Sequence, residues 1–213
     1  MNVNLILVEL SATPSRLEKE AILRKNAGNA ALKETIRLAL DPLITFHIRK
    51  IPAYTRSEKE TNTLDFALGQ MYRWSTREIT GNAAINALRD LLSTLEPYDA
   101  LVIEKIIQRD LRCGVSEATA NKIWPGLVPD YPVMLASGFE QKLIQKIKWP
   151  AVVQHKLDGM RFNAIIKNGK VEFRTRNGKL VEGLEDLEAE FLSLNTVDYP
   201  VVYDGELLVK ESG

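Results

Sequence analysis

A chain of 213 residues is long enough to bury a core, as one large domain or as two modest ones. Its 45% hydrophobic and 26% charged residues are typical of a globular protein, so the composition excludes disordered, collagen-like and low-complexity classes. The 28 basic and 28 acidic residues cancel, and the net charge therefore gives no argument for a nucleic-acid partner.

Cysteine and histidine are scarce. Cys113 is the single cysteine, which excludes an intramolecular disulfide and a multi-thiolate metal site and fits a reducing compartment. We expect its side chain to be a small buried hydrophobic group at a helix end. The apolar run at 5–8 has no basic leader and is followed by Glu9, so we expect no signal peptide, no membrane span and a cytoplasmic protein.

Apolar stripes at helical spacing predict that the first part of the chain is all-α. Thr13 and Pro14 predict the start of the first helix, and Ser116 predicts the cap of a short last helix. The segment 41–48 is compatible with a further short helix. The stripes, in chain order, are Leu17, Ala21 and Ile22; Leu32, Ile36 and Leu40; Leu64, Ala67, Met71 and Trp74; Ile85, Leu88, Leu92 and Leu95; and Ile103, Ile106 and Ile107. We expect Trp74, and Trp124 in the last helix, to lie in the core rather than to stack on bases.

A cluster of prolines and glycine at 125–132 cannot lie inside regular elements, and it predicts a boundary between domains 1–129 and 130–213. Beyond it, 151–155 reads as a buried strand and 162–166 as a second strand. Asn168-Gly169 predicts a tight hairpin turn into a third strand at 171–175. An acidic amphipathic helix at 184–194 and a strand that begins at Val201 follow, so the pattern is all-α and then α+β.

The segment between the first two predicted strands carries the residues with the clearest chemistry. Lys156 would end a buried strand, where lost hydration lowers an ammonium pKa and exposes the amine for nucleophilic attack. Gly159 permits a tight turn, and Arg161 can present its planar fork to phosphate oxygens. A surface turn with an ion-paired lysine is the alternative that these residues leave open.

Charge is concentrated around this segment. Seven lysines and three arginines lie between Lys142 and Lys179 against two acidic residues, a local net charge of +8. Such a stretch would attract polyanions, although runs of charge more often form ordinary solvated faces.

Residues 154–161 (Gln-His-Lys-Leu-Asp-Gly-Met-Arg) resemble the nucleotidyl-lysine motif of the ATP-dependent DNA ligases and their relatives, the RNA capping enzymes and RNA ligases. In the same order and spacing, 174–178 resembles the family's Ser-Arg-x-Gly segment, with Thr175 in place of serine, and 203–207 resembles its Asp-Gly-Glu-Leu segment. Upstream, 109–114, 121–129 and 132–136 are similar to the DNA ligases of T-even-type bacteriophages. This likeness includes the helical part, which capping enzymes lack.

The resemblance implies an ATP-dependent DNA ligase that seals nicks in duplex DNA through a lysyl-AMP intermediate on Lys156, in replication, repair and recombination. ATP and Mg²⁺ would be its cofactors, with Glu206 as the metal ligand. The remaining ATP-binding residues that the resemblance implies are Gln154, Arg161, Arg176 and Glu206. Asp158 is assigned only as a member of the motif, and a structural role in the turn is the alternative.

The fold that the resemblance implies is an all-α DNA-binding domain, followed by the first part of an α+β nucleotidyltransferase (adenylation, ATP-grasp-like) domain. We expect Arg112 and Lys122 of the helical domain to contact the DNA backbone, because phosphate contacts fix register without reading sequence. On charge alone, an ordinary exposed position remains the simpler interpretation of each. The protein would be a monomer with nicked double-stranded DNA as its partner, in the cytoplasm of an infected bacterium if a phage encodes it.

The chain ends at Gly213, before the later motifs and the OB-fold domain that the family has, so we expect an N-terminal fragment. We expect that this fragment does not seal nicks by itself. Two alternatives stay open: a capping enzyme or RNA ligase that shares the lysine motif, and a non-enzymatic DNA-binding module.

Overall fold

The computed structural model describes residues 2–48, 50–57, 62–131, 133–134, 136–194, 196–197 and 199–208. The chain divides into two compact units, Met1–Asp130 and Tyr131–Gly213. Helices make up the regular structure described in the first unit, and a small sheet with two helices makes up that of the second. The predicted order of helices followed by a small sheet is therefore confirmed.

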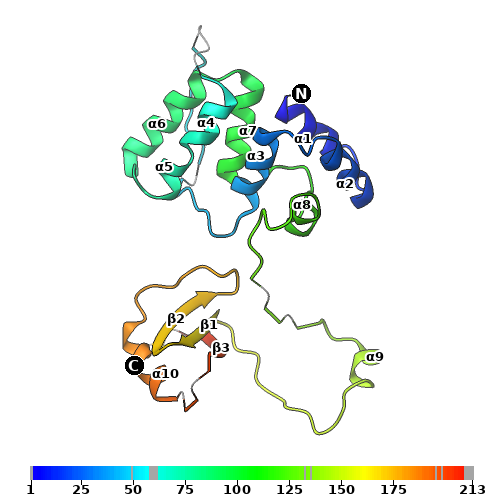
Figure 1. Ribbon diagram of the computed structural model, residues 1–213, viewed down its shortest axis with the longest axis vertical. Coiled ribbons are helices and arrows are strands. Elements are labelled where there is room, and N and C mark those ends of the chain that lie inside the picture. The colour runs from blue at the N-terminus through cyan, green and yellow to red at the C-terminus, as the bar shows by residue number, and fades with distance from the viewer. Residues whose placement is uncertain are drawn as a thin grey trace. The chain divides into compact units, whose positions relative to one another are not determined.

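The first unit is built from helices (Figure 1), most of which begin at a polar capping residue. Asn2, Ser15, Asn29, Thr63 and Ser116 each accept a hydrogen bond from a first-turn amide with the side chain, which satisfies a donor that the helix leaves unpaired. The helices are α1 Val3–Ser11, α2 Arg16–Lys25, α3 Ala30–Leu40, α4 Leu64–Gln70, α5 Tyr72–Ser75, α6 Gly81–Ser93, α7 Pro97–Gln108 and α8 Glu117–Ile123.

One continuous apolar core holds these helices together, with α7 packed against α1, α3, α4 and α6. Both tryptophans of this unit's stripes are buried in it, as predicted. The indole N–H of Trp74 donates to the carbonyl of Ala84 at 3.0 Å, and that of Trp124 donates to the carbonyl of Ala27 at 3.0 Å. Each ring thus buries its apolar surface while its polar atom is satisfied. Cys113 is buried as predicted, and burial raises the pKa of its thiol.

Three details of the helical prediction were wrong. Helix α1 was not predicted, because its apolar run is short, yet its inner face is fully buried. The first predicted helix begins at Arg16 with Ser15 as its cap, not at Thr13. The segment after Asp41 is not helical, because the guanidinium of Arg109 donates to the carbonyls of Asp41 and Ile44 and holds it as a loop.

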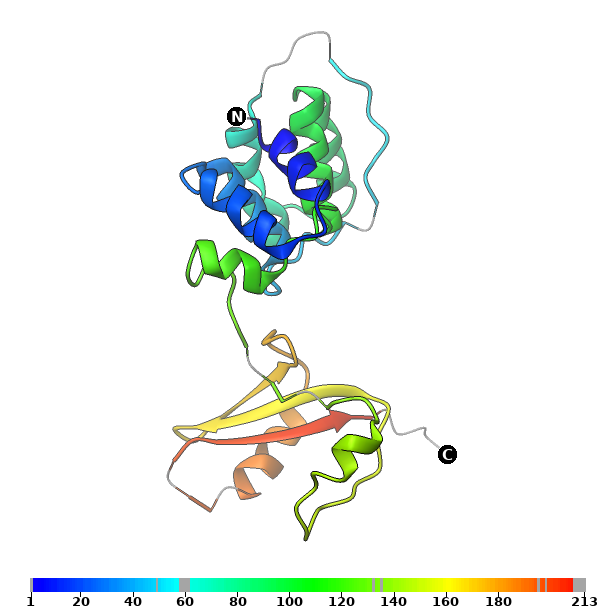
Figure 2. The same cartoon turned by 90° about the vertical axis from the view of Figure 1, so that its right-hand side faces the viewer.

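The second unit contains an antiparallel sheet of three strands in the order β2-β1-β3 (Figure 2). The strands are β1 Met160–Lys167, β2 Lys170–Thr175 and β3 Val201–Leu207. The predicted hairpin turn is confirmed: Asn168 and Gly169 join β1 to β2 with φ angles of 51° and 70°. Two positive φ angles match the twist of a tight hairpin, which favours Asn-Gly.

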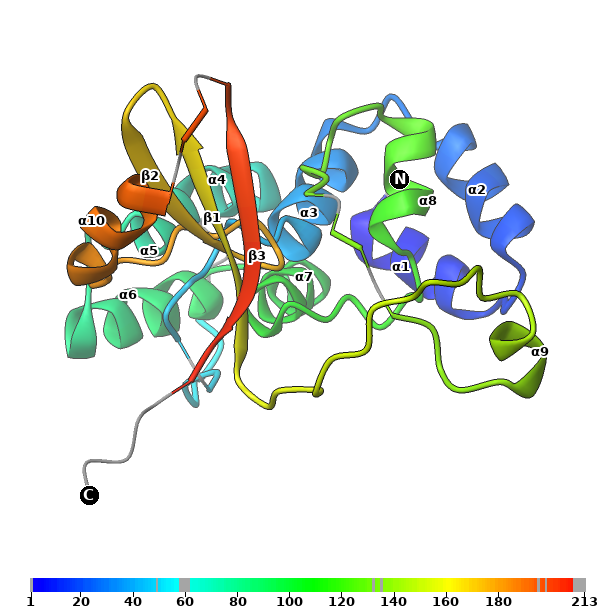
Figure 3. The same ribbon diagram turned by 90° about the horizontal axis from the view of Figure 1, so that it is seen from below.

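One face of this sheet is covered by α10 Glu185–Leu194, which contacts β1 and β2 (Figure 3). The core between them is small and aromatic. Phe191 of α10 makes edge or tilted contacts with Phe162, Phe173 and Tyr203 at centroid distances of 5.5–6.1 Å. The other helix of this unit, α9 Gln141–Ile144, buries none of its residues.

The prediction of a buried strand at 151–155 was wrong. These residues belong to no strand, and the side chains of Val152 and Val153 are 86% and 87% exposed. Both edges of β1 are already paired, by β2 and by β3, so the segment has no edge of β1 to join. The β propensity of the apolar β-branched residues in this segment was therefore not enough to form a strand.

None of the described helices combines the length and the hydropathy that a bilayer crossing requires.

Candidate nucleotide site

A cavity of about 780 Å³ in the second unit is bounded by the lysine motif and by β3. Its lining includes four of the five residues that the sequence assigned to ATP, namely Gln154, Lys156, Arg161 and Glu206. Asp204 and Gly205 lie between them on β3. The fifth assigned residue, Arg176, does not line this cavity but follows β2 at an exposed turn.

The antiparallel register of β1 and β3 explains why motifs 43 or more residues apart in sequence meet here. Arg161 pairs with Glu206, and Met160 pairs with Leu207, at the end of β1 that follows the lysine segment. The strand pairing therefore brings the carboxylates of β3 to the segment that carries Lys156. Lys156 itself is exposed in a segment without regular secondary structure and does not end a buried strand, contrary to the prediction.

Arg161 is held by three hydrogen bonds. Its Nε and Nη2 donate to the two carboxylate oxygens of Asp204 at 2.9 and 2.5 Å, and its Nη1 donates to the carbonyl of Met134 at 2.6 Å. The bidentate contact with Arg161 lowers the pKa of Asp204, and the same hydrogen bonds to Asp204 raise the pKa of Arg161. A guanidinium has about five N–H donors, so about two stay available to a ligand in the cavity.

Gly159 joins the lysine segment to the end of β3. Its backbone N–H donates to Oε2 of Glu206 at 2.9 Å. A Cβ at Gly159 would lie 2.3 Å from the carbonyl oxygen of Leu207 and 2.7 Å from Cδ2 of Leu208, closer than real Cβ contacts. Only glycine allows this close approach of the lysine segment to the end of β3.

The segment that follows β2 is folded back on itself. The N–H of Gly178 donates to the carbonyl of Thr175 at 2.8 Å, and Gly178 has a φ of 78°. A Cβ at Gly178 would lie 3.0 Å from the ring of Tyr131, whose hydroxyl donates to Oδ1 of Asn163 at 3.3 Å. Tyr131 therefore packs the start of this unit onto the turn that presents Arg176.

The two residues assigned to DNA lie in the first unit. Arg112 is exposed at a φ of 52°, in a loop whose Cys113 carbonyl accepts a hydrogen bond from the buried amine of Lys19. Lys122 is half exposed, and its amine forms an ion pair of 2.7 Å with Glu20. This hydrogen bond lowers the pKa of Glu20, which also pairs with Arg16. Among the described residues, the guanidinium of Arg112 has no ion-pair partner, whereas Lys122 would have to share its charge with Glu20.

The carboxylate oxygens of the cavity are too few to hold a metal ion unless a bound nucleotide supplies further oxygen ligands. Among the described residues, no group of three or more His, Cys, Asp or Glu side chains is placed to hold an ion. Glu206 uses Oε2 for Gly159, and both oxygens of Asp204 are bonded to Arg161. One free carboxylate oxygen fits Mg²⁺, which proteins usually hold through one or two carboxylates plus substrate phosphates and water.

Comparisons with known proteins show which of the proteins with such a motif this chain resembles. No family model matches the chain. The DNA ligases of enterobacteria phages T4 and T6 are each 36% identical to it over 221 aligned residues, which cover 97% of the chain. The chain is therefore similar to the phage DNA ligases over nearly its whole length. It spans 45% of the length of these curated ligases.

Two solved structures agree with this relationship. The structure named Pmar-Lig_PreS3 superposes with a TM-score of 0.78 at 32% identity, and covers 98% of the chain and 50% of its own length. The structure named Pmar-Lig_Pre superposes with a TM-score of 0.79 at 31% identity, with the same coverage. Each likeness thus extends along nearly the whole chain.

Sequence reasoning missed the residues that support the site. It did not assign Asp204, although this residue is next to Gly205 and Glu206 in the motif and its spacing places it on β3. It gave residues 130–136, at the start of the second predicted domain, no role in the site, but Tyr131 packs on Gly178, Met134 binds Arg161 and Ala136 lines the cavity. No signal in the sequence marked these contacts, because they join a loop to a sheet through backbone and aromatic atoms.

Proposed function

We propose that this chain carries the adenylate-accepting lysine of an ATP-dependent DNA ligase, and that Lys156 is the nucleophile. One observation carries the proposal: Lys156, Arg161 and Glu206 line one cavity in a chain that aligns with phage DNA ligases over 97% of its length. A primary amine, a guanidinium, a carboxylate and the carboxamide of Gln154 are together suited to a nucleoside triphosphate.

The reaction at Lys156 exchanges one bond to phosphorus for another. The amine gives its proton to solvent, which its exposed position allows, and its lone pair attacks the α-phosphorus of ATP. A nitrogen–phosphorus bond forms while the bond from the α-phosphorus to the bridging oxygen of pyrophosphate breaks, and pyrophosphate leaves. The adenylate then passes to the 5′-phosphate of a nick, and the 3′-hydroxyl displaces it to seal the strand.

The other lining groups position the nucleotide and compensate its charge, which is the main work of the protein in phosphoryl transfer. The free donors of Arg161 bind phosphate oxygens while Asp204 fixes the guanidinium plane. Glu206 accepts a hydrogen bond from the ribose with the oxygen that Gly159 leaves free, or offers that oxygen to a metal. Gln154 reads the adenine edge, and Arg176 approaches the nucleotide or nick phosphates from its turn.

Magnesium, when bound through Glu206 and the phosphates, would screen the charge that repels the attacking electron pair. The helical residues 1–129 would bind the backbone of nicked duplex DNA, with Arg112 and Lys122 as contacts, and residues 130–213 would belong to the adenylation domain. We propose that the acting species is a monomer.

The test is covalent labelling of the polypeptide encoded by the complete reading frame. The protein is incubated with α-labelled ATP or GTP and Mg²⁺, and then separated under denaturing conditions. We expect label from ATP in the native protein and in Lys170→Ala, a control at the exposed hairpin, and no label in Lys156→Ala. Label from GTP alone would support the capping-enzyme alternative, and label retained in Lys156→Ala would remove this lysine from its role.

A further inference from the structure

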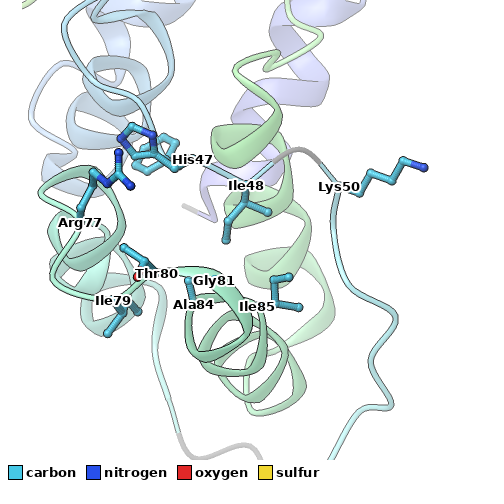
Figure 4. A pocket seen from close by; sticks show the side chains of 10 residues that line it. His47, Ile48, Lys50, Arg77, Ile79, Thr80, Gly81, Ala84 and Ile85 are labelled. Carbon is cyan, nitrogen blue, oxygen red and sulfur yellow. The ribbon is translucent and has the colours of Figure 1, made fainter. Parts of the chain in front are cut away.

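A second cavity, of about 510 Å³, lies in the helical unit and has no role in the site described above (Figure 4). Its walls come from the segment that follows α3 and from the turn that leads into α6, with the first turns of α6 itself. The lining combines two kinds of side chain, basic groups and isoleucines. A ligand that fits the cavity must satisfy both.

The charged side chains that line this cavity are all basic. Arg77 and Lys50 line it together with the imidazole of His47, and no Asp or Glu is among its lining residues. Figure 4 shows Arg77 pointing toward His47 at one rim, whereas Lys50 stands at the opposite rim with its amine directed outward. Within the described part of the chain, neither Arg77 nor Lys50 has an ion-pair partner, so both charges are available to an anion.

The backbone adds donors to the same rim. Thr80 and Gly81, which line the cavity, begin α6, and the first intrahelical bond of this helix runs from the N–H of Ala84 to the carbonyl of Thr80. The three amides before Ala84 therefore lack an intrahelical acceptor, and the Thr80 side chain makes no capping hydrogen bond. These amides strengthen the preference for an anion that the two cations already establish.

The apolar part of the lining limits which anion fits. Ile48, Ile79 and Ile85 lie beside the charged rim. A free phosphate ion would use the cations but leave the isoleucines in water, and a neutral apolar ligand would leave the cations unused. One step of a DNA backbone presents a charged phosphate and, next to it, the apolar edge of a deoxyribose, so it matches both surfaces.

We propose that this cavity binds one phosphate–deoxyribose step of the duplex DNA substrate. The phosphate lies against Arg77 and the start of α6, the sugar lies against the isoleucines, and Lys50 reaches the neighbouring phosphate. The proposal rests on the function proposed above, and it adds a DNA contact at a part of the helical unit to which Arg112 and Lys122 do not belong. Since it contacts backbone only, it carries no sequence preference.

The experiment measures affinity for a short fluorescein-labelled duplex with a central nick, by anisotropy over a range of salt concentrations. The variants are Arg77→Asn combined with Lys50→Ala, because asparagine tolerates the positive φ of 60° at position 77. The matched control is Arg24→Ala, an exposed arginine on α2 that lines no cavity described here. Circular dichroism checks that the helical content of each variant is native.

We expect the double variant to bind about tenfold more weakly and its salt dependence to fall by about 1.8 in log–log slope, about 0.9 for each lost phosphate contact. The control should stay within about twofold of the native chain. Native affinity in the double variant, or an equal loss in Arg24→Ala, would overturn the proposal. Displacement of the duplex by inorganic phosphate at constant ionic strength would reassign the cavity to a free anion and also overturn it.

Labelling of Lys156 with ATP in the same variants separates this proposal from the function on which it rests. Normal labelling together with unchanged DNA affinity would reject the cavity and leave the adenylation function standing. Loss of DNA affinity confined to the double variant, in a native protein that takes no label, would reject the adenylation function while the DNA contact is supported.

Discussion

The two units of the chain keep their shapes by different means. The helical unit is held together by one large apolar core, several of its helices begin at side chains that cap them, and its buried side chains are mostly aliphatic. The sheet unit has a core of three buried residues against one helix, and its motif residues are held by polar contacts on an exposed edge. The residues of the candidate nucleotide site thus lie in the unit with the smaller core, where single hydrogen bonds fix the positions of their side chains.

The largest expected effect follows from the core of the helical unit. Leu88 is fully buried there, so Leu88→Ala should lower the free energy of unfolding of this unit by about 2–5 kcal/mol. Leu101, which is 41% exposed, provides the matched control, and Leu101→Ala should cost less than about 1 kcal/mol. Urea denaturation followed by circular dichroism measures both, and equal losses would contradict the contrast between the two positions.

The sheet unit should respond to a single added methyl group. Gly159→Ala places a Cβ against the Leu207 carbonyl, which must shift the lysine segment away from β3 and lower the rate of Lys156 adenylation by about 100-fold or more. Unfolding of the helical unit should not change. Gly138→Ala is the control, because nothing lies within 4 Å of a Cβ at that position. Normal adenylation in Gly159→Ala would show that the contact with β3 does not position the lysine.

A smaller effect is expected at the ion pair that fixes Arg161. Asp204→Asn keeps the shape of the side chain but removes the charge that holds the guanidinium fork. We expect the KM for ATP in the adenylation reaction to rise about tenfold, with the rate at saturating ATP changing less, because Arg161 keeps its bond to Met134. An unchanged KM would mean that Asp204 does not position Arg161 for the nucleotide.

The smallest effect is a change in titration. Because Arg161 lowers the pKa of Asp204, the pair stabilises the fold above the ordinary pKa of an aspartate, and this contribution is lost as the pH falls through the lower folded-state value. Arg161→Gln should therefore raise the pKa of Asp204 back toward its ordinary value. NMR titration of the side-chain carboxyl measures it, and the same pKa in both proteins would contradict this cause.

Sequence patterns predicted the helical unit better than the site. Leucine stripes and a cap such as Ser116 encode their helix locally, so α3, α6, α7 and α8 could be placed from spacing alone, as could the Asn168-Gly169 hairpin. The strand expected at 151–155 was wrong, because the β propensity of its residues does not report whether another strand pairs with it. The sequence motifs were enough to select Lys156, Arg161 and Glu206. The contacts that Asp204, Met134 and Tyr131 make with the site depend on the tertiary structure, so the motifs did not predict them.

Tyr131 has a practical meaning for anyone who wishes to divide this polypeptide. Its ring covers Gly178 and its hydroxyl is bonded to Asn163, and three residues later the Met134 carbonyl holds Arg161. A recombinant piece that starts after residue 136 would discard this N-terminal brace and leave the turn of Arg176 without its aromatic cover. A truncated variant of the second unit should therefore begin before Tyr131.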